Sequence, residues 1–342
     1  MSLPLLPHAE YVRKLKPLLP EAAFRPAPER VLVLLAHGVI IGGLSALAGQ
    51  LSARWAQLLL APVIGHSMAC ATFVSHDLMH GSVVRVRWLR YLLEVIGWSF
   101  MYMPASVWRK VHQAHHIHAQ TLQDGDRLMI ESERSGFTEL FSFTYPNQRN
   151  PWWNPLIFLH WVLYAGGNTA TAYLYGLTGR APDSSFVFAY SRWEVLVVTL
   201  ELLVIGAVHG GMAWLMGFDP VTFLICDGVA FGIASSIVTF YVYTNHMLRP
   251  LMAEPDPVLG TTSVEVPAWV SWVHSHFTHH SEHHVFPAMN SKWYPEVGRL
   301  LREHFPDRYQ RLPYWTAVRG TWDRPPFLPN RVEGTPAEDP GS

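Results

Sequence analysis

The sequence predicts an all-α integral membrane protein in which four main transmembrane helices form two hairpins, accompanied by interfacial helices and a histidine-rich cap. Composition supports a membrane protein, because 49% of the 342 residues are hydrophobic and only 15% are charged, whereas soluble domains carry about 25% charged residues. Mean hydropathy is positive, at +0.12. Apolar runs of spanning length, and three dense histidine motifs outside them, supply the remaining support.

Four stretches are long enough to cross a bilayer and nearly free of charge, and they are the expected spans: residues 31–49, 55–75, 193–217 and 220–244. The connections between the first two and between the last two are short, which predicts two hairpins. Two further apolar stretches, residues 88–103 and 152–177, contain charged residues, Pro or Gly, so we expect interfacial or half-embedded helices. If these two also cross the membrane, the number of spans rises to six.

Basic residues predict the orientation. In the four-span arrangement, 24 of the 25 Lys and Arg residues lie on the side of the two termini, and Arg54 alone lies on the other side. Cytoplasmic segments are enriched in these residues, so all three histidine motifs are expected on the cytoplasmic face. Arg outnumbers Lys 21 to 4, which favours a GC-rich bacterial genome, and we expect a multi-pass protein of the bacterial inner membrane.

The chain divides into three expected regions. Residues 1–30 form a cytoplasmic, basic and interfacial N-terminal segment, residues 31–313 form the membrane domain, and residues 314–342 form a C-terminal extension. The end of this extension is rich in Pro, Glu and Gly, which predicts partial disorder. Cys70 and Cys226 fall inside expected spans, where we expect them to pack rather than to form a disulfide.

Three histidine motifs dominate the chain. They read HxxxH, HxxHH and HxxHH, and they hold eight of the 19 histidines: His76 and His80; His112, His115 and His116; His280, His283 and His284. Spacings of three and four residues place side chains on one helical face, and neutral imidazole is a common metal ligand. A lone histidine is more often a packing or surface residue, but three such motifs are more than random placement of the histidines would produce. One metal ion cannot use eight ligands, so the motifs predict a dinuclear, all-histidine centre.

Ligand type alone leaves the metal open, because imidazole suits Fe, Zn, Cu and Ni. A structural zinc site is closed by four ligands, whereas eight or more around two ions leave positions at which O2 can bind. We therefore expect two non-haem iron ions next to a lipid, with O2 as co-substrate. The chain has no haem, flavin or nicotinamide motif and no cysteine cluster, so an external electron donor is expected. No nucleic-acid partner is expected.

Three segments resemble the membrane fatty acid desaturase family: HFTHHSEHHVFPAM over residues 276–289, Tyr294-Pro295-Glu296-Val297, and the acidic pair Asp124 and Asp126 after the second motif. The resemblance covers roughly residues 32–313. It implies a desaturase-like membrane domain, a histidine-box di-iron centre, and a lipid or fatty acyl substrate. It also implies an external donor, either ferredoxin or cytochrome b5 with its reductase.

The resemblance further implies which residues bind iron. The eight motif histidines match family ligands, and His246, between the last span and the final motif, matches a ninth. The pattern departs at Val242, where acyl-CoA desaturases have an asparagine four residues before this histidine, while Asn245 is adjacent to it here. No separate protein acid or base is assigned. Six residues are candidates for orienting the ligands through hydrogen bonds: Asp77, His118, Asp124, Asp126, Asn245 and Glu282.

The expected function is O2-dependent introduction of a double bond into a lipid acyl chain. The superfamily also holds lipid hydroxylases, carotenoid ketolases and a fatty acid decarboxylase that forms a terminal alkene, and these reactions are alternatives for the same centre. A non-catalytic, metal-handling membrane protein is the alternative from another class. Transporters, however, place ionisable ligands within the bilayer, whereas these motifs lie outside the expected spans.

Overall fold

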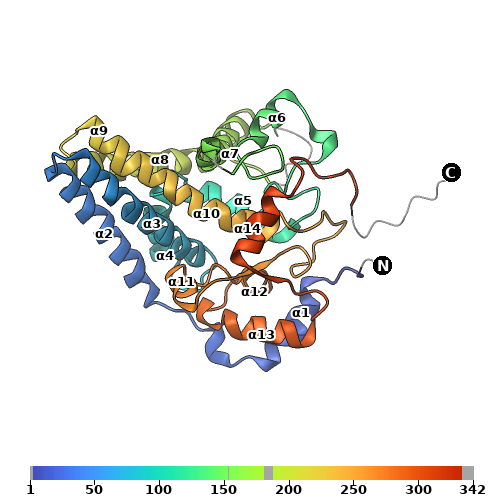
Figure 1. Cartoon of the computed structure of the whole chain (residues 1–342). Coiled ribbons are helices and arrows are strands. Elements are labelled where there is room, and N and C mark those ends of the chain that lie inside the picture. The colour runs from blue at the N-terminus through green and yellow to red at the C-terminus, as the bar shows by residue number, and fades with distance from the viewer. Residues whose placement is uncertain (1–2, 153, 181–187, 333–342) are drawn as a thin grey trace.

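The structure, a computed structural model, describes residues 3–152, 154–180 and 188–332 (Figure 1). Residues 333–342, the end of the tail for which the sequence predicts disorder, lie outside the described residues. The described chain is mostly helical. Long helices extend to one side in Figure 1, and shorter elements gather into a cap at the other side, where the described chain begins and ends.

Four helices of the described chain are long and apolar enough to cross a membrane, as predicted. They are α2 (Arg30–Gln50), α3 (Arg54–Met79), α8 (Arg192–Leu215) and a continuous helix made of α9 (Pro220–Phe223), the π-helical turn η5 (Leu224–Val229) and α10 (Ala230–His246). Helices α3 and α10 run past the expected ends of their apolar stretches. The first histidine motif and His246 therefore stand at the ends of these helices.

Helix α3 is the central element. It packs against α2, against α4 (Arg87–Ser99) and against α10 with η5, and Figure 1 shows α2, α3 and α10 side by side. Gly65 permits this arrangement, because a Cβ atom there would lie 2.3 Å from the carbonyl oxygen of Ala230. The absence of a side chain thus lets the backbones of α3 and α10 approach closely.

A buried polar pair joins α8 to the π-helical turn. His209 Nδ1 lies 2.8 Å from Asp227 Oδ1, and His209 Nε2 lies 2.9 Å from the carbonyl oxygen of Ser99. Tyr102 stacks on the imidazole with ring centroids 3.7 Å apart and donates a hydrogen bond to Asp227. Both ring nitrogens of His209 therefore have partners, as buried polar groups in an apolar layer require.

The region between the second and third spans contributes shorter helices. The expected interfacial stretches form α4 and, farther along, η4 (Pro155–Leu159) with α7 (His160–Thr178). Neither is among the four helices that meet the length and apolarity for a span. Between them lie α5 (Ala105–His118), which carries the second histidine motif, η3 (Glu131–Glu133) and α6 (Gly136–Ser142).

The cap is built around a small parallel sheet that the sequence did not predict. Strand β1 (Ser263–Glu265) pairs with β2 (Arg311–Pro313), with Ser263 opposite Arg311. The remaining cap elements are α11 (Ala268–Val273), α12 (His280–Val285), η6 (Ser291–Trp293), α13 (Tyr294–His304) and α14 (Tyr314–Trp322). Helix α12 carries the third histidine motif, so the sheet and its flanking helices hold this motif in place.

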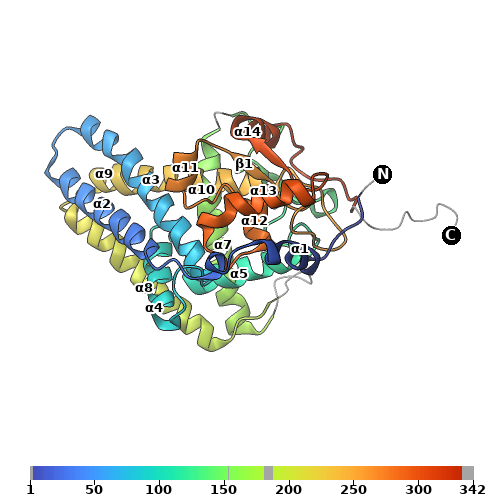
Figure 2. The same ribbon diagram turned by 90° about the horizontal axis from the view of Figure 1, so that it is seen from below.

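The N-terminal segment folds onto the cap. Helix α1 (His8–Leu15), followed by η1 (Lys16–Leu18) and η2 (Glu21–Phe24), packs against α12 and α13, as Figure 2 shows. Tyr11 is fully buried, and its hydroxyl donates to Asp256 over 2.8 Å. Burial of Tyr11 and Leu15 gives this segment its own hydrophobic contacts with the elements around the third motif.

Candidate metal centre

The nine histidines expected to bind metal lie together in the structure as two clusters. The five-histidine cluster comprises His76, His80, His112, His116 and His283, and the four-histidine cluster comprises His115, His246, His280 and His284. Within each cluster, the nearest ring nitrogens all lie within 4.8 Å of one another. Residues more than 200 positions apart in the sequence thus converge on two adjacent points.

Local structure explains how the motifs are divided. His112 and His116 are four residues apart on α5 and point to the same cluster, while His115 points to the other. Helix α12 likewise sends His280 and His284 to one cluster and His283 to the other. The predicted helical presentation of the motifs is therefore what the structure shows, and α5 and α12 each contribute to both clusters.

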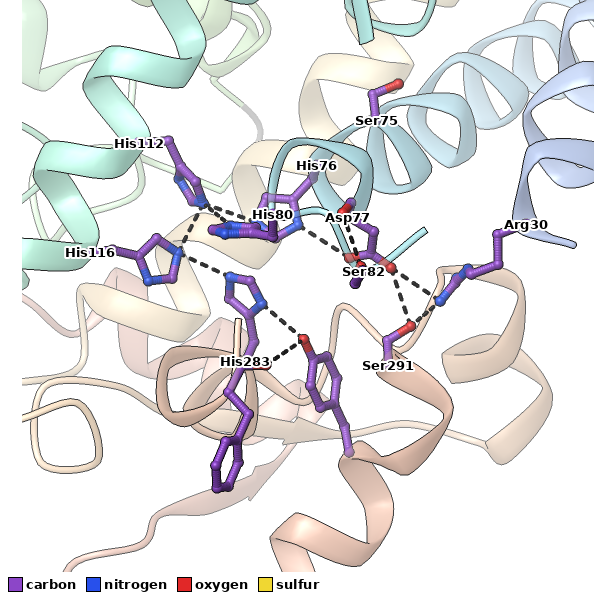
Figure 3. A network of polar contacts seen from close by, with 12 residues as sticks. Arg30, Ser75, His76, Asp77, His80, Ser82, His112, His116, His283 and Ser291 are labelled. Atoms are coloured by element: carbon purple, nitrogen blue, oxygen red, sulfur yellow. Dashed lines mark hydrogen bonds and ion pairs between the residues drawn. The ribbon is translucent and has the colours of Figure 1, made fainter. Parts of the chain in front are cut away.

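Distances in the five-histidine cluster fit a shared metal ion. His112 Nε2 lies 3.0 Å from His76 Nε2, 3.1 Å from His80 Nε2 and 3.0 Å from His116 Nε2 (Figure 3). One imidazole nitrogen makes only one in-plane hydrogen bond, so hydrogen bonding does not account for three such neighbours. Ligands about 2.1 Å from one ion and at right angles to each other lie about 3.0 Å apart.

The four-histidine cluster has the same character. His246 Nε2 lies 3.2 Å from His115 Nε2 and 2.6 Å from His280 Nε2, and His284 Nε2 lies 3.1 Å from His280 Nε2. The imidazoles of His116 and His284 stack with centroids 4.3 Å apart, which places the two clusters side by side. A pair of neighbouring transition-metal ions therefore fits the donor set.

Burial favours the neutral form of six of these imidazoles. It lowers pKa values well below the ordinary histidine value, and neighbouring imidazoles lower them further, for the six histidines His80, His112, His116, His280, His283 and His284. A neutral imidazole has a free lone pair on one nitrogen. These six imidazoles thus present lone pairs rather than protons at neutral pH, as metal binding requires. His115 differs, because the effect of burial is outweighed by Asp124, which raises its pKa.

Asp124 fixes the orientation of His115. Its two carboxylate oxygens lie 2.9 and 3.1 Å from His115 Nδ1, and they also accept hydrogen bonds from the backbone N–H groups of Gln120 and Asp126. Burial opposes ionisation of Asp124, but His115 and these donors lower the pKa of the carboxyl group below its ordinary value. The contact holds the proton on Nδ1 and leaves Nε2 free to face the cluster.

Asp77 occupies a similar place beside His76, with less direct contact. Its Oδ1 lies 3.4 Å from His76 Nδ1, while its Oδ2 forms an ion pair with Arg30 over 3.1 Å and accepts from Ser291 over 3.2 Å (Figure 3). The carboxylate therefore links the start of α2 and the cap to the end of α3. It anchors the first motif between two other parts of the chain.

Tyr294 is a neighbour of the clusters that the sequence did not assign. Its hydroxyl lies 3.1 Å from His283 Nδ1, on the side of the imidazole opposite the five-histidine cluster. The residue belongs to the segment that carries part of the family resemblance, but no local spacing relates it to His283. Glu282, by contrast, lies 2.9 Å from His279 Nδ1 and accepts from Tyr309 over 2.7 Å, so it supports the residue before the third motif rather than one of the nine histidines.

The other three candidates have different surroundings. Asp126 accepts a hydrogen bond from Tyr164 over 3.0 Å and lies close to Asp124 and His115. Asn245 is fully buried beside His246, and neither polar atom of its side chain has a hydrogen-bond partner within the described chain. Such a buried amide normally meets a partner, so it is available to a water molecule or ligand. His118 is half-buried at the end of α5 and belongs to neither cluster.

An apolar cavity adjoins the clusters. Five of the nine histidines line it, namely His76, His112, His115, His246 and His280. Much of the remaining wall is aromatic and includes Phe73, Trp98, Trp108, Trp161, Tyr243 and Phe277. These residues form a lining suited to an apolar ligand.

Comparisons with known proteins agree with this geometry. Residues 53–317 match the family described as fatty acid desaturase. The chain is 24% identical over 266 residues to the sn-1 oleoyl-lipid 12-desaturase of Synechocystis sp., in an alignment that covers 75% of this chain and 71% of that protein. The family match spans most of the chain and includes every histidine of both clusters. The protein is therefore a member of the fatty acid desaturase family, a membrane oxidoreductase with histidine clusters suited to metal.

Proposed function

We propose that the protein is an O2-dependent di-iron desaturase that introduces a double bond into the acyl chain of a lipid. The observation that carries this proposal is the division of nine histidines into clusters of five and four. Two iron ions held by these clusters would activate O2, the oxidant that accepts two hydrogen atoms from adjacent methylenes and, with two electrons and two protons from outside, becomes two water molecules. Each turnover would take electrons from a separate donor, either ferredoxin or cytochrome b5 with its reductase.

The protein's own contribution is to hold imidazoles in fixed positions. Asp124 and Tyr294 bond the Nδ1 atoms of His115 and His283, so their Nε2 atoms face the clusters. Fixed ligands need little reorganisation when metal binds, and they keep the reacting centre in one place relative to the substrate. All nine histidines have this role in the proposal, with His246 supplied by α10 and the other eight by the three motifs.

The cavity is the proposed seat of the acyl chain. Its apolar and aromatic lining would exclude water and hold a methylene segment next to the histidines that open into it. The name of the Synechocystis relative refers to an oleoyl lipid, which favours a lipid-bound acyl group as the substrate class.

The proposed topology places the four spans as two hairpins, with both termini and the histidine clusters on the cytoplasmic side of a bacterial inner membrane. The distribution of basic residues supports this orientation, because Arg54 alone lies at the opposite end of the spans. Within this topology, residues 1–30, 31–313 and 314–342 remain the proposed division into N-terminal segment, membrane domain and extension. An electron donor would approach the cap from the cytoplasm.

The test is expression of the wild-type protein and of two histidine variants in a bacterial host, followed by gas chromatography–mass spectrometry of fatty acid esters and neutral volatiles. His80→Ala removes a member of the five-histidine cluster, and His118→Ala is the matched control, because His118 is in neither cluster. We expect a new double bond at a fixed position with wild type and His118→Ala, and none with His80→Ala. Purified His80→Ala should also contain less iron while remaining folded in detergent.

Other products would redirect the assignment. Hydroxylated, ketolated or terminal-alkene products with unchanged unsaturation would replace desaturation with another reaction of the same centre. Full activity of His80→Ala would refute the ligand role of His80. Metal binding without any oxygen consumption, in the presence of an electron donor and lipid, would instead support a non-catalytic metal-handling protein.

A further inference from the structure

A third group of metal-binding side chains lies outside the two histidine clusters. His66 and Cys70 are one turn apart on α3, and His274 follows α11 in the cap. One ligand atom from each residue lies within 4.8 Å of the other two. The sequence predicted a packing role for Cys70, which falls inside an expected span, and His274 lies more than 200 residues away from it in the chain.

The distances suit a single metal ion. His66 Nε2 lies 3.1 Å from His274 Nε2, and Cys70 Sγ lies 3.8 Å from the ring nitrogens of His66. With metal–nitrogen and metal–sulfur distances of about 2.1 and 2.3 Å, tetrahedral ligands lie about 3.4 Å apart for two nitrogens and about 3.6 Å apart for nitrogen and sulfur. The nitrogen–nitrogen separation lies within a few tenths of an ångström of its value. Cys70 Sγ is equally far from Nδ1 and Nε2 of His66, so a rotation of the Cys70 or His66 side chain is needed before the thiolate and Nε2 share one ion.

The orientation of His274 is also that of a ligand. Tyr241 lies 2.7 Å from His274 Nδ1 through its hydroxyl oxygen, so Nε2 points at His66 and Cys70. Metal-binding histidines commonly have the far nitrogen held by such an oxygen, and His115 and His283 have the same arrangement in the main clusters. His37 of α2 interacts electrostatically with His66 and His274, but it is not among the three residues whose ligand atoms lie within 4.8 Å of one another.

We propose that His66, Cys70 and His274 form a third metal site, which binds a zinc-like transition-metal ion and fastens the cap to α3. Thiolate combined with imidazole favours such ions over hard cations. Between His274 and the third motif lies Phe277, which stacks on Phe73 at 4.7 Å and meets the edge of His76 at 5.1 Å. A metal at this site would therefore set the position of the segment that leads into α12.

The test uses Co2+ as the probe with the full-length protein in detergent under reducing conditions. A thiolate bound to Co2+ gives a near-ultraviolet charge-transfer band, and the nine histidines of the two clusters supply no sulfur, so this band reports only on a cysteine site. The chain has two cysteines, and Cys226 is the matched control, because it is also buried in a span and donates to the carbonyl oxygen of Gln57 instead. We expect the band in wild type and in Cys226→Ser, and its complete loss in Cys70→Ser.

The spectrum of Cys226→Ser decides the question even if Cys70→Ser does not fold, because Cys70 is the only thiol in Cys226→Ser. Absence of the band from wild type or Cys226→Ser, or its persistence in Cys70→Ser, would overturn the proposal. Tyr241→Phe keeps all three ligands but frees His274 Nδ1, and it should weaken Co2+ binding at this site by about 10–100-fold. Unchanged affinity in that variant would contradict the assignment of His274. None of these readouts depends on desaturase activity, so they stand apart from the proposed function.

Discussion

Replacement of Asp124 by asparagine is the most informative single change near the clusters. The carboxylate contacts three donors with two oxygens: Oδ1 faces His115 and the backbone N–H of Asp126, and Oδ2 faces His115 and the backbone N–H of Gln120. Asparagine has one acceptor oxygen, so its NH2 group must face at least one of these donors. The variant loses the negative charge at His115 and leaves a buried N–H unpaired.

The size of the effect follows from these contacts. A hydrogen bond to a charged group contributes about 1.5–3 kcal/mol, and each factor of ten in affinity corresponds to about 1.4 kcal/mol. Loss of the His115 contact should therefore weaken metal binding at the four-histidine cluster by about 10–100-fold, the range seen when residues that orient metal ligands are changed. Binding at the five-histidine cluster should change less, because Asp124 contacts none of its members in the described structure and acts on it only through the helices that the two clusters share.

The assay is anaerobic titration of the metal-free protein with Fe2+ against a competing chelator, with desaturase activity measured in parallel. Asp126→Asn is the matched control, because this neighbouring carboxylate accepts from Tyr164 and an amide oxygen can do the same. We expect one weakened iron and a large loss of activity in Asp124→Asn, and near wild-type iron affinity in Asp126→Asn. Equal iron affinity in Asp124→Asn and wild type would refute the view that this carboxylate orients His115.

Three further changes test other contacts. Tyr294→Phe removes the oxygen at His283 Nδ1 and should lower iron affinity about 10-fold or more; unchanged iron content after dialysis against a chelator would contradict this. Gly65→Ala places a Cβ 2.3 Å from a backbone oxygen of α10 and should destabilise the fold by about 1–3 kcal/mol, whereas Gly206→Ala on α8, with open space around it, should be neutral or slightly stabilising in thermal unfolding. Asp227→Ala breaks a buried pair and should cost about 3–5 kcal/mol; a melting temperature equal to that of wild type would show that the pair contributes little.

The local part of the metal centre could be predicted from sequence. The spacing within each motif is three or four residues, and helical geometry brings such residues close together, so the sequence could predict that the eight motif histidines cluster. His246 stands alone in its segment, and the family resemblance was needed to find it. The four spans could be predicted for a similar reason, because a helix that crosses a bilayer needs about 20 consecutive apolar residues, and such runs are visible in the sequence.

Contacts between distant segments could not be predicted. Tyr294 contacts His283 with no helical spacing between them, and Asp227, in a π-helical turn, contacts His209 of α8, 18 residues earlier in the chain. The contact between His66 and His274 could not be predicted for the same reason, their large separation in the sequence. In each case one residue looked like an ordinary tyrosine, aspartate or histidine until the fold brought its partner within hydrogen-bond distance.

The sharing of α5 and α12 between the two clusters has a consequence for how the centre assembles. Either cluster forms only when both helices are in place, together with α3 for one cluster and α10 for the other. The first ion to bind must hold both helices in place. The second ion needs the same two helices, so it binds to a site that is already formed. Loading should therefore be cooperative, and molecules with a single ion should be rare during iron limitation. Cells would then hold a mixture of empty and complete enzyme rather than a graded population of half-filled centres.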